Sequence, residues 1–184
     1  MTRRSIGNRL TAAIVAATAV AGVSAQSSLE YNVKAALLLN FARFIEWPEG
    51  AFGNPRAPVE MCVFTPNPFG DALDRALRGE SVGTRPLSAR DVRSPSETTG
   101  CHLLFIPAGT ESRAIGMLRQ AGPHTVTVGE SPRFETMGGA VTFVLEGGRV
   151  RFNVNLRPVE ARGVRISARM LHLASRVDRA TQEK

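Results

Sequence analysis

A short, unbroken apolar run at residues 101–106 (Cys-His-Leu-Leu-Phe-Ile) constrains the fold of this chain most. A strand with one face in water alternates polar and apolar residues, whereas a strand that is apolar throughout must be covered on both faces. The run is also too short for an ordinary buried helix. Residues 101–106 therefore predict an inner strand of a parallel sheet, with helices packed on both sides of that sheet.

The rest of the chain alternates between strand and helix patterns. Further strands are predicted at residues 59–65, 85–92 and 125–128. Helices are predicted from the capping box at 27–30 to Trp47-Pro48, over 69–77 before Gly79, after Thr110, from Ser131-Pro132, and from Ser167 through Leu171, Ala174 and Val177. This alternation predicts an α/β fold, as a single three-layer domain with a mixed, mostly parallel sheet.

A β-hairpin is predicted near the C-terminus, where Gly147-Gly148 separates apolar segments 140–145 and 149–156. The second segment alternates, which places Arg149, Arg151, Asn153 and Asn155 on one face of its strand. That polar face is either an ordinary solvated sheet face or a recognition surface for a partner.

The first 25 residues have the pattern of a secretory signal peptide. Arg3, Arg4 and Arg9 precede an uncharged segment at 10–23, and small residues lead to a cleavage site after Ala25. The alternatives are an anchoring helix or a twin-arginine signal. We therefore expect residues 1–25 to be removed and residues 26–184 to act outside the cytoplasm. The remaining 20 Lys and Arg against 16 Asp and Glu give a net charge of +4, and we expect no nucleic-acid partner.

Export makes the two cysteines significant. An oxidising compartment and an even number of cysteines favour a disulfide, and with two cysteines the pair is Cys62–Cys101. The alternative is two buried free thiols. A separation of 39 residues with only His102 alongside does not match a zinc site, so we expect no metal and no cofactor.

No familiar catalytic motif is present. The chain contains neither a phosphate-binding loop nor a nucleophile elbow, and His102, His124 and His172 fall in three different predicted elements. We therefore expect a binding protein rather than an enzyme. Trp47, the single Trp, is either a hydrophobic plug at a helix end or part of a binding surface.

An ordered set of segments resembles the YfiR family of periplasmic proteins. The segments are Lys34-Ala35, residues 40–48, Cys62, residues 68–70, residues 101–106, residues 126–129, Gly138-Gly139, residues 149–156 and residues 166–171. The resemblance implies a periplasmic repressor that binds the periplasmic region of an inner-membrane diguanylate cyclase and keeps cyclic-di-GMP low. It also implies that Cys62–Cys101 is the structural disulfide. The second cysteine pair of some family members is missing here.

The resemblance leaves several partners open. The membrane partner could instead be a sensor kinase, and an outer-membrane lipoprotein could draw the repressor away. A homodimer is also open, whichever membrane partner is bound. We expect Trp47, Arg151, Asn153 and Asn155 to contact the partner, because Trp and Arg are enriched in interface hot spots. The second hypothesis is a periplasmic sensor of a small ligand, since open α/β sheets offer a crevice at the carboxyl ends of their strands.

Overall fold

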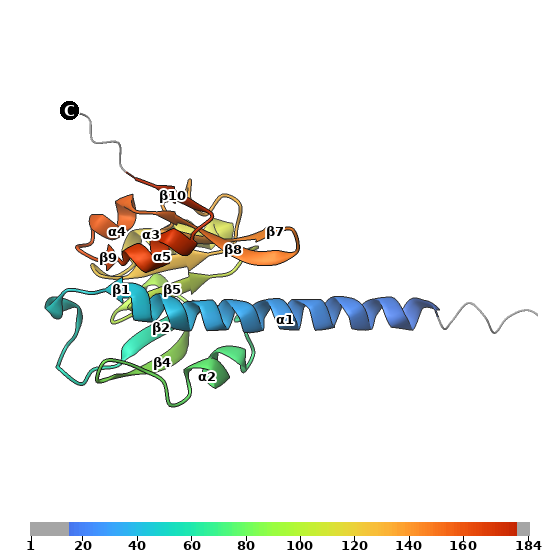
Figure 1. Ribbon diagram of the computed structural model, residues 1–184, viewed down its shortest axis with the longest axis horizontal. Helices are drawn as coiled ribbons and strands as arrows, with labels where there is room; N and C mark the ends of the chain where they lie inside the picture. Colours follow the sequence, from blue (N-terminus) through green and yellow to red (C-terminus); the bar gives the residue numbers. More distant parts are fainter. Residues whose placement is uncertain (1–14, 180–184) are drawn as a thin grey trace, which may run out of the picture.

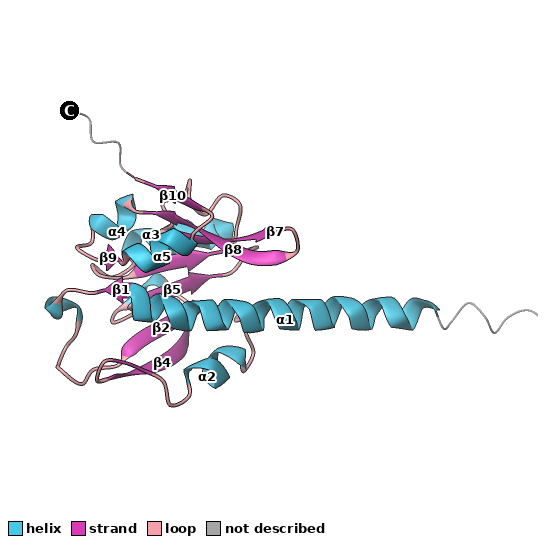
Figure 2. Cartoon of the chain, viewed as in Figure 1, coloured by secondary structure: helices cyan, strands magenta, loops and turns pink. Residues whose placement is uncertain are grey.

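A computed structural model describes residues 15–179 of the chain (Figure 1). Of the predicted signal peptide, residues 1–14 lie outside the described residues, and its remainder belongs to the first helix. The helices are α1 Val15–Phe44, α2 Ala72–Leu77, α3 Glu111–Gln120, α4 Arg157–Glu160 and α5 Ala168–Leu173, with 3-10 turns at η1 Glu49–Ala51 and η2 Pro95–Thr98. Figure 2 shows that α1 extends well beyond the body of the domain.

An eight-stranded sheet forms the middle layer. Its strands are β2 Val59–Phe64, β3 Ser81–Val82, β4 Arg85–Val92, β5 Leu103–Ile106, β6 Val126–Gly129, β7 Val141–Glu146, β8 Arg149–Asn155 and β10 Arg176–Asp178. They are ordered β10-β8-β7-β6-β5-β2-β4-β3, and only the β7–β8 and β3–β4 pairs are antiparallel. A separate two-stranded sheet pairs β1 Ile45–Glu46 with β9 Arg165–Ile166.

The inner strand β5 explains why helices are needed on both sides. Leu103 and Phe105 belong to a core cluster with α1, α2 and α5, whereas Leu104 and Ile106 pack in a second cluster with α3. All four side chains are almost fully buried. The predicted three-layer α/β fold with a mostly parallel sheet is therefore confirmed.

Most strand predictions hold, and the hairpin forms as expected. β4 has the predicted bounds, and Gly147 and Gly148 have φ of +57° and +73°, which a two-residue type I′ turn requires. Gly129 and Gly139 have another role, because a Cβ at either position would overlap the buried ring of Phe134.

Three helix predictions are wrong. Helix α1 does not begin at the capping box but runs through it, because the Ala-rich segment before Ser27 favours helix. Residues 131–138 form turns rather than a helix, with Phe134 held in the second core cluster. The last helix ends at Leu173 instead of continuing to Val177. Ser175 donates a backbone hydrogen bond to Phe152, and β10 then pairs with the free edge of β8.

Candidate functional site

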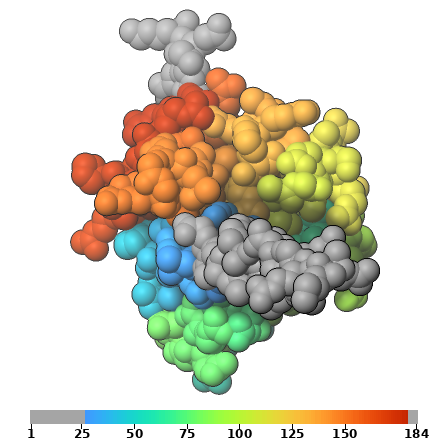
Figure 3. Space-filling view, turned by 90° about the vertical axis from the view of Figure 1, so that its right-hand side faces the viewer, coloured from blue at the N-terminus to red at the C-terminus, as the bar shows by residue number. Residues whose placement is uncertain are grey.

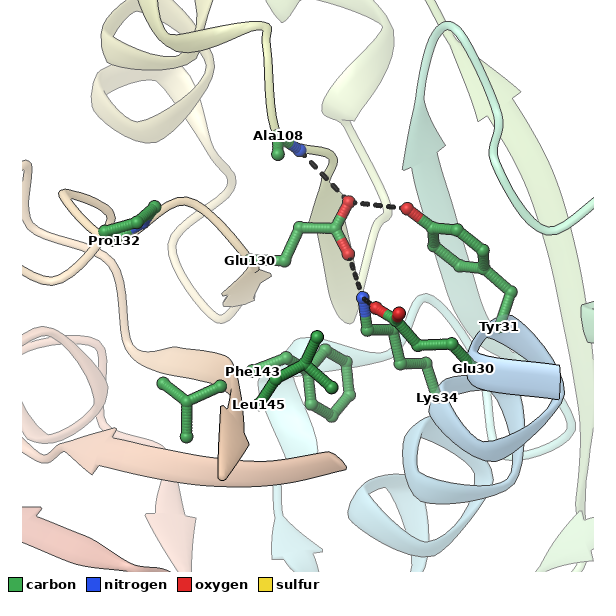
Figure 4. A pocket seen from close by; sticks show the side chains of 9 residues that line it. Glu30, Tyr31, Lys34, Ala108, Glu130, Pro132, Phe143 and Leu145 are labelled. Carbon is green, nitrogen blue, oxygen red and sulfur yellow. Dashed lines mark hydrogen bonds and ion pairs between the residues drawn. The ribbon is translucent and has the colours of Figure 1, made fainter. Parts of the chain in front are cut away.

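A cavity of about 410 Å³ lies at the carboxyl ends of β5 and β6, where α1 crosses this edge of the sheet (Figure 4). Ala108 follows β5, Glu130 follows β6, and both lie beside residues of α1. The lining is Glu30, Tyr31, Lys34, Ala108, Glu130, Pro132, Phe143, Val144 and Leu145. This is the place where open α/β sheets commonly bind ligands.

Glu130 is the centre of the polar contacts in this cavity. One carboxylate oxygen accepts hydrogen bonds from the Tyr31 hydroxyl at 2.9 Å and from the Ala108 backbone N–H at 3.1 Å. The other oxygen forms an ion pair with Lys34 Nζ, which also pairs with Glu30 one turn earlier in α1. The side chains of Lys34 and Glu130 are 5% and 7% exposed, so this charge cluster is desolvated. We call Glu30, Tyr31, Lys34 and Glu130 the α1 anchor.

The electrostatics of the α1 anchor favour a protonated phenol. Burial raises the pKa of Tyr31, and the negative charge of Glu130 raises it further. The Lys34 ammonium lies 4.6 Å from the centre of the Tyr31 ring, which adds a cation–π contact. With two carboxylates and one ammonium, the cluster has a formal charge of −1. It joins α1 to the sheet, and a ligand that entered the cavity would be favoured if it were cationic.

The α1 anchor is a site that the sequence did not predict. Lys34 was identified only as part of the family resemblance, and Glu130 was not singled out. The two residues are 96 positions apart, so sequence spacing does not indicate that they meet. Two signals were available: Lys34 is a lone cation on a helix face that is otherwise apolar, and Glu130 directly follows a buried strand.

Trp47 belongs to a second cluster, at the other end of the strands. Its indole N–H donates to the His124 carbonyl at 3.0 Å, and its ring contacts Phe52 and His102 edge to face. The side chain is half-buried. These contacts hold the indole against Phe52, His102 and His124, as the plug interpretation expects, although Trp47 also lines a surface cavity.

His102 connects this cluster to the sheet as a neutral ring. Its Nδ1 accepts from the Glu60 backbone N–H at 3.0 Å, so the proton is on Nε2, which donates to the Ala51 carbonyl at 3.1 Å. The ring stacks on Phe52 with centroids 4.5 Å apart. Burial lowers the pKa of His102, although the hydrogen bond to Ala51 and the charge of Glu60 oppose that shift.

The structure does not bring the expected contact residues together. Trp47 lines a cavity with Pro48 and Val164, whereas Arg151 lines another with Leu29 near the hairpin turn. Arg151 is exposed and Asn153 is half-buried.

Asn155 does not lie on the open polar face, solvated or partner-binding, on which the strand alternation places it. It is 9% exposed, and its side-chain amide donates to the Gly139 carbonyl at 3.4 Å and accepts from the Arg157 backbone at 3.2 Å. The alternation of the strand is as predicted, but the segments around Gly139 and Arg157 cover this end of β8.

The disulfide between Cys62 and Cys101 is present. It joins β2 to the segment before β5, with Cα atoms 5.7 Å apart, inside the range that disulfides adopt. Both residues are buried in the second core cluster, and Arg90 contacts Cys101 Sγ at 3.5 Å. This burial suits a structural bond.

Within residues 15–179, the His, Cys, Asp and Glu side chains do not form a group of three that could hold a metal ion. Over the same residues, no helix is both long enough and apolar enough to cross a membrane.

Comparison with known proteins assigns the family. The YfiR/HmsC-like family matches residues 31–175, which is most of the chain, and the protein belongs to that family. Residues 31–175 contain three members of the α1 anchor, both cysteines and the hairpin.

Two solved structures are more distantly similar. A conserved domain protein from Vibrio cholerae O1 biovar El Tor N16961 matches with a TM-score of 0.48 and 11% identity over 65% of this chain and 55% of its own. The ABC domain from Streptococcus pneumonia, solved in complex with L-Trp, matches with a TM-score of 0.46 and 9% identity over 64% and 54%. This chain thus spans about half the length of each.

Proposed function

We propose that the protein is a periplasmic regulatory binding protein that represses an inner-membrane signalling enzyme by binding its periplasmic region. A diguanylate cyclase is the first candidate, and a sensor kinase is the second. The observation that carries this proposal is membership of the YfiR/HmsC-like family across residues 31–175. The signal-peptide pattern at residues 1–25 supplies the route to the periplasm.

Two structural features support the proposal. The Cys62–Cys101 bond suits an oxidising compartment. The buried His102 and the half-buried His124 use ring nitrogens to contact backbone groups, which is a structural role. A protein of this kind controls a membrane enzyme by binding one of its conformational states more tightly than the other.

The test measures both binding and signalling in the native organism. Deletion of the gene should raise cyclic-di-GMP, and the tagged mature protein should co-purify the cyclase from detergent-solubilised membranes. An unchanged cyclic-di-GMP level together with a co-purified sensor kinase would replace the first candidate by the second. The absence of any co-purified inner-membrane protein would reject the proposal. A lipoprotein partner is tested in parallel with an outer-membrane fraction.

The cavity beside the α1 anchor favours a second candidate function, a sensor of a small cationic ligand. Its walls are apolar, with Phe143, Val144 and Leu145 on one side, and its charges sum to −1. A panel of small amphipathic amines tested by thermal shift should stabilise the wild type and not a Glu30→Gln variant. Equal stabilisation of both proteins, or of neither, would reject this candidate.

A further inference from the structure

An apolar groove with a basic rim lies between α1 and the β7–β8 hairpin. Its cavity, of about 430 Å³, is lined by Leu29, Glu30, Val33, Leu145, Gly148, Arg149, Val150 and Arg151. Figure 3 views the molecule from the end at which α1 projects, with the hairpin region above the helix. We call this feature the α1–hairpin groove. It adjoins the anchor cavity, since Glu30 and Leu145 line both.

The apolar residues of the groove are unusually open to solvent. Leu29 is 62% exposed, Val33 40% and Leu145 60%, and these are three of the five large apolar side chains that are exposed in the described part of the chain. Leu29 and Val33 are four residues apart, so they lie on one face of α1. Exposed apolar side chains that gather beside a hollow mark an interaction site more often than scattered ones do.

The charges at the rim are unpaired. Arg149 and Arg151 are exposed, and neither forms an ion pair or a side-chain hydrogen bond with any residue of the described range 15–179. By contrast, Arg43, Arg165 and Arg176 on nearby elements each pair with a glutamate. The groove therefore combines an apolar centre with two cations that form no ion pair within the described residues, although Glu30 also lines it and Glu146 lies opposite Arg149 in the hairpin register.

We propose that the α1–hairpin groove binds an amphipathic helix of the membrane partner, whose apolar face packs on Leu29, Val33 and Leu145 and whose acidic residues pair with Arg149 and Arg151. This inference rests on the proposed function and adds where the partner binds and what its surface contains. A helix suits the groove because one of its walls is itself a helix, and helices pack along one another through apolar side chains three and four residues apart.

The shape of the groove argues against two other occupants. In a symmetric dimer the same patch faces its own copy, so a concave groove would meet a second concave groove and its apolar residues would stay uncovered. A lipid bilayer is flat and does not enter a concave groove, whereas a single helix is narrow enough to do so.

The test combines a photocrosslinker with charge reversal in the full chain, expressed in its native organism. A photoreactive residue at Leu145 should form an adduct with the inner-membrane partner, and the adduct should map by mass spectrometry to an acidic, amphipathic helical segment. The same residue at Ile115, which is exposed on α3, is the matched control. Arg149→Glu/Arg151→Glu should weaken co-purification of the partner at least about tenfold, as expected for hot-spot arginines. Arg78→Glu/Arg119→Glu, which changes the charge equally elsewhere, should not.

Rescue makes the test specific. Replacement of the acidic residues of the crosslinked segment by Arg should restore binding to Arg149→Glu/Arg151→Glu. A self-adduct, or binding to phosphatidylglycerol vesicles that the charge reversal abolishes, would overturn the inference. Undiminished co-purification by Arg149→Glu/Arg151→Glu would also overturn it while leaving the proposed function intact. Failure of the wild type to co-purify any membrane protein would instead reject the proposed function, and the inference with it.

Discussion

The α1 anchor and the α1–hairpin groove adjoin one another on the same helix, but they differ in the burial and pairing of their charged side chains. In the anchor, Lys34 and Glu130 are nearly fully buried and each has two or more partners. In the groove, Arg149 and Arg151 are exposed and have no partner within residues 15–179. The two regions share Glu30 and Leu145, so they can be compared directly.

The contrast separates charges that hold the fold from charges that are free to bind. A buried ion pair that loses one partner leaves an uncompensated charge, which destabilises a protein strongly. Removal of an exposed cation costs the folded protein little stability, because water already solvates that charge. The anchor should therefore control stability, and the groove should control binding.

The largest effect is expected from Lys34→Met, which leaves Glu130 buried without its cation. We expect the free energy of unfolding to fall by about 3–5 kcal/mol, measured by urea denaturation. Tyr31→Phe removes one hydrogen bond to the same carboxylate and should cost about 1.5–3 kcal/mol. The double variant Lys34→Met/Glu130→Leu removes both charges and should recover most of the loss. If Lys34→Met were as stable as the wild type, the anchor would have no structural role.

The sequence predicted the framework of the fold better than either of these two regions. Strand β5 was recognisable because four successive apolar residues leave no face for water, and the hairpin because Gly147 and Gly148 suit its turn. The anchor was not recognisable, because only the folded sheet brings Glu130 beside Lys34. The edge strand β10 was missed for a similar reason. Val177 continues the helical spacing of α5, but its segment forms a strand because it pairs with the free edge of β8.

A similar argument applies to the four expected contact residues. Spacing predicted that Arg151, Asn153 and Asn155 share one face of a strand. It could not show that other segments of the same protein, around residues 139 and 157, cover Asn155. The disulfide was predictable because composition allows a single pair. Leu29 and Val33 were not identified as a surface, because an apolar helix position is more often buried than exposed.

Trp47→Ala tests whether the plug behaves like the anchor or like the groove. The indole is packed against Phe52 and His102 and donates to His124, so its loss should destabilise the protein by about 3 kcal/mol. Thermal unfolding measures this loss, with His172→Ala as an exposed control. A Trp47→Ala protein that kept its melting temperature and lost repression would place Trp47 in the interface.

A smaller effect is expected from pH, through His102. Burial lowers the pKa of this histidine in the folded protein, so below the ordinary histidine pKa the unfolded chain binds a proton that the folded chain does not. Stability should therefore fall as the pH decreases from about 7 to about 5.5. His102→Asn keeps an acceptor for the Glu60 N–H and should flatten this dependence, whereas His172→Asn should not. A wild-type stability that rises toward acid pH would contradict this prediction.

The smallest change in stability is expected from Arg151→Met, although its effect on binding should be the most selective. The guanidinium is exposed and unpaired within the described residues, so its removal should alter the free energy of unfolding by less than about 0.5 kcal/mol. Binding of an acidic partner should weaken. The remaining binding should depend less on salt than wild-type binding, because salt screens the attraction between exposed charges, with a Debye length of about 10 Å at 0.1 M ionic strength, and the variant has one such charge fewer. Measurement of partner binding at two salt concentrations tests this. Equal salt dependence in both proteins would place Arg151 outside the interface.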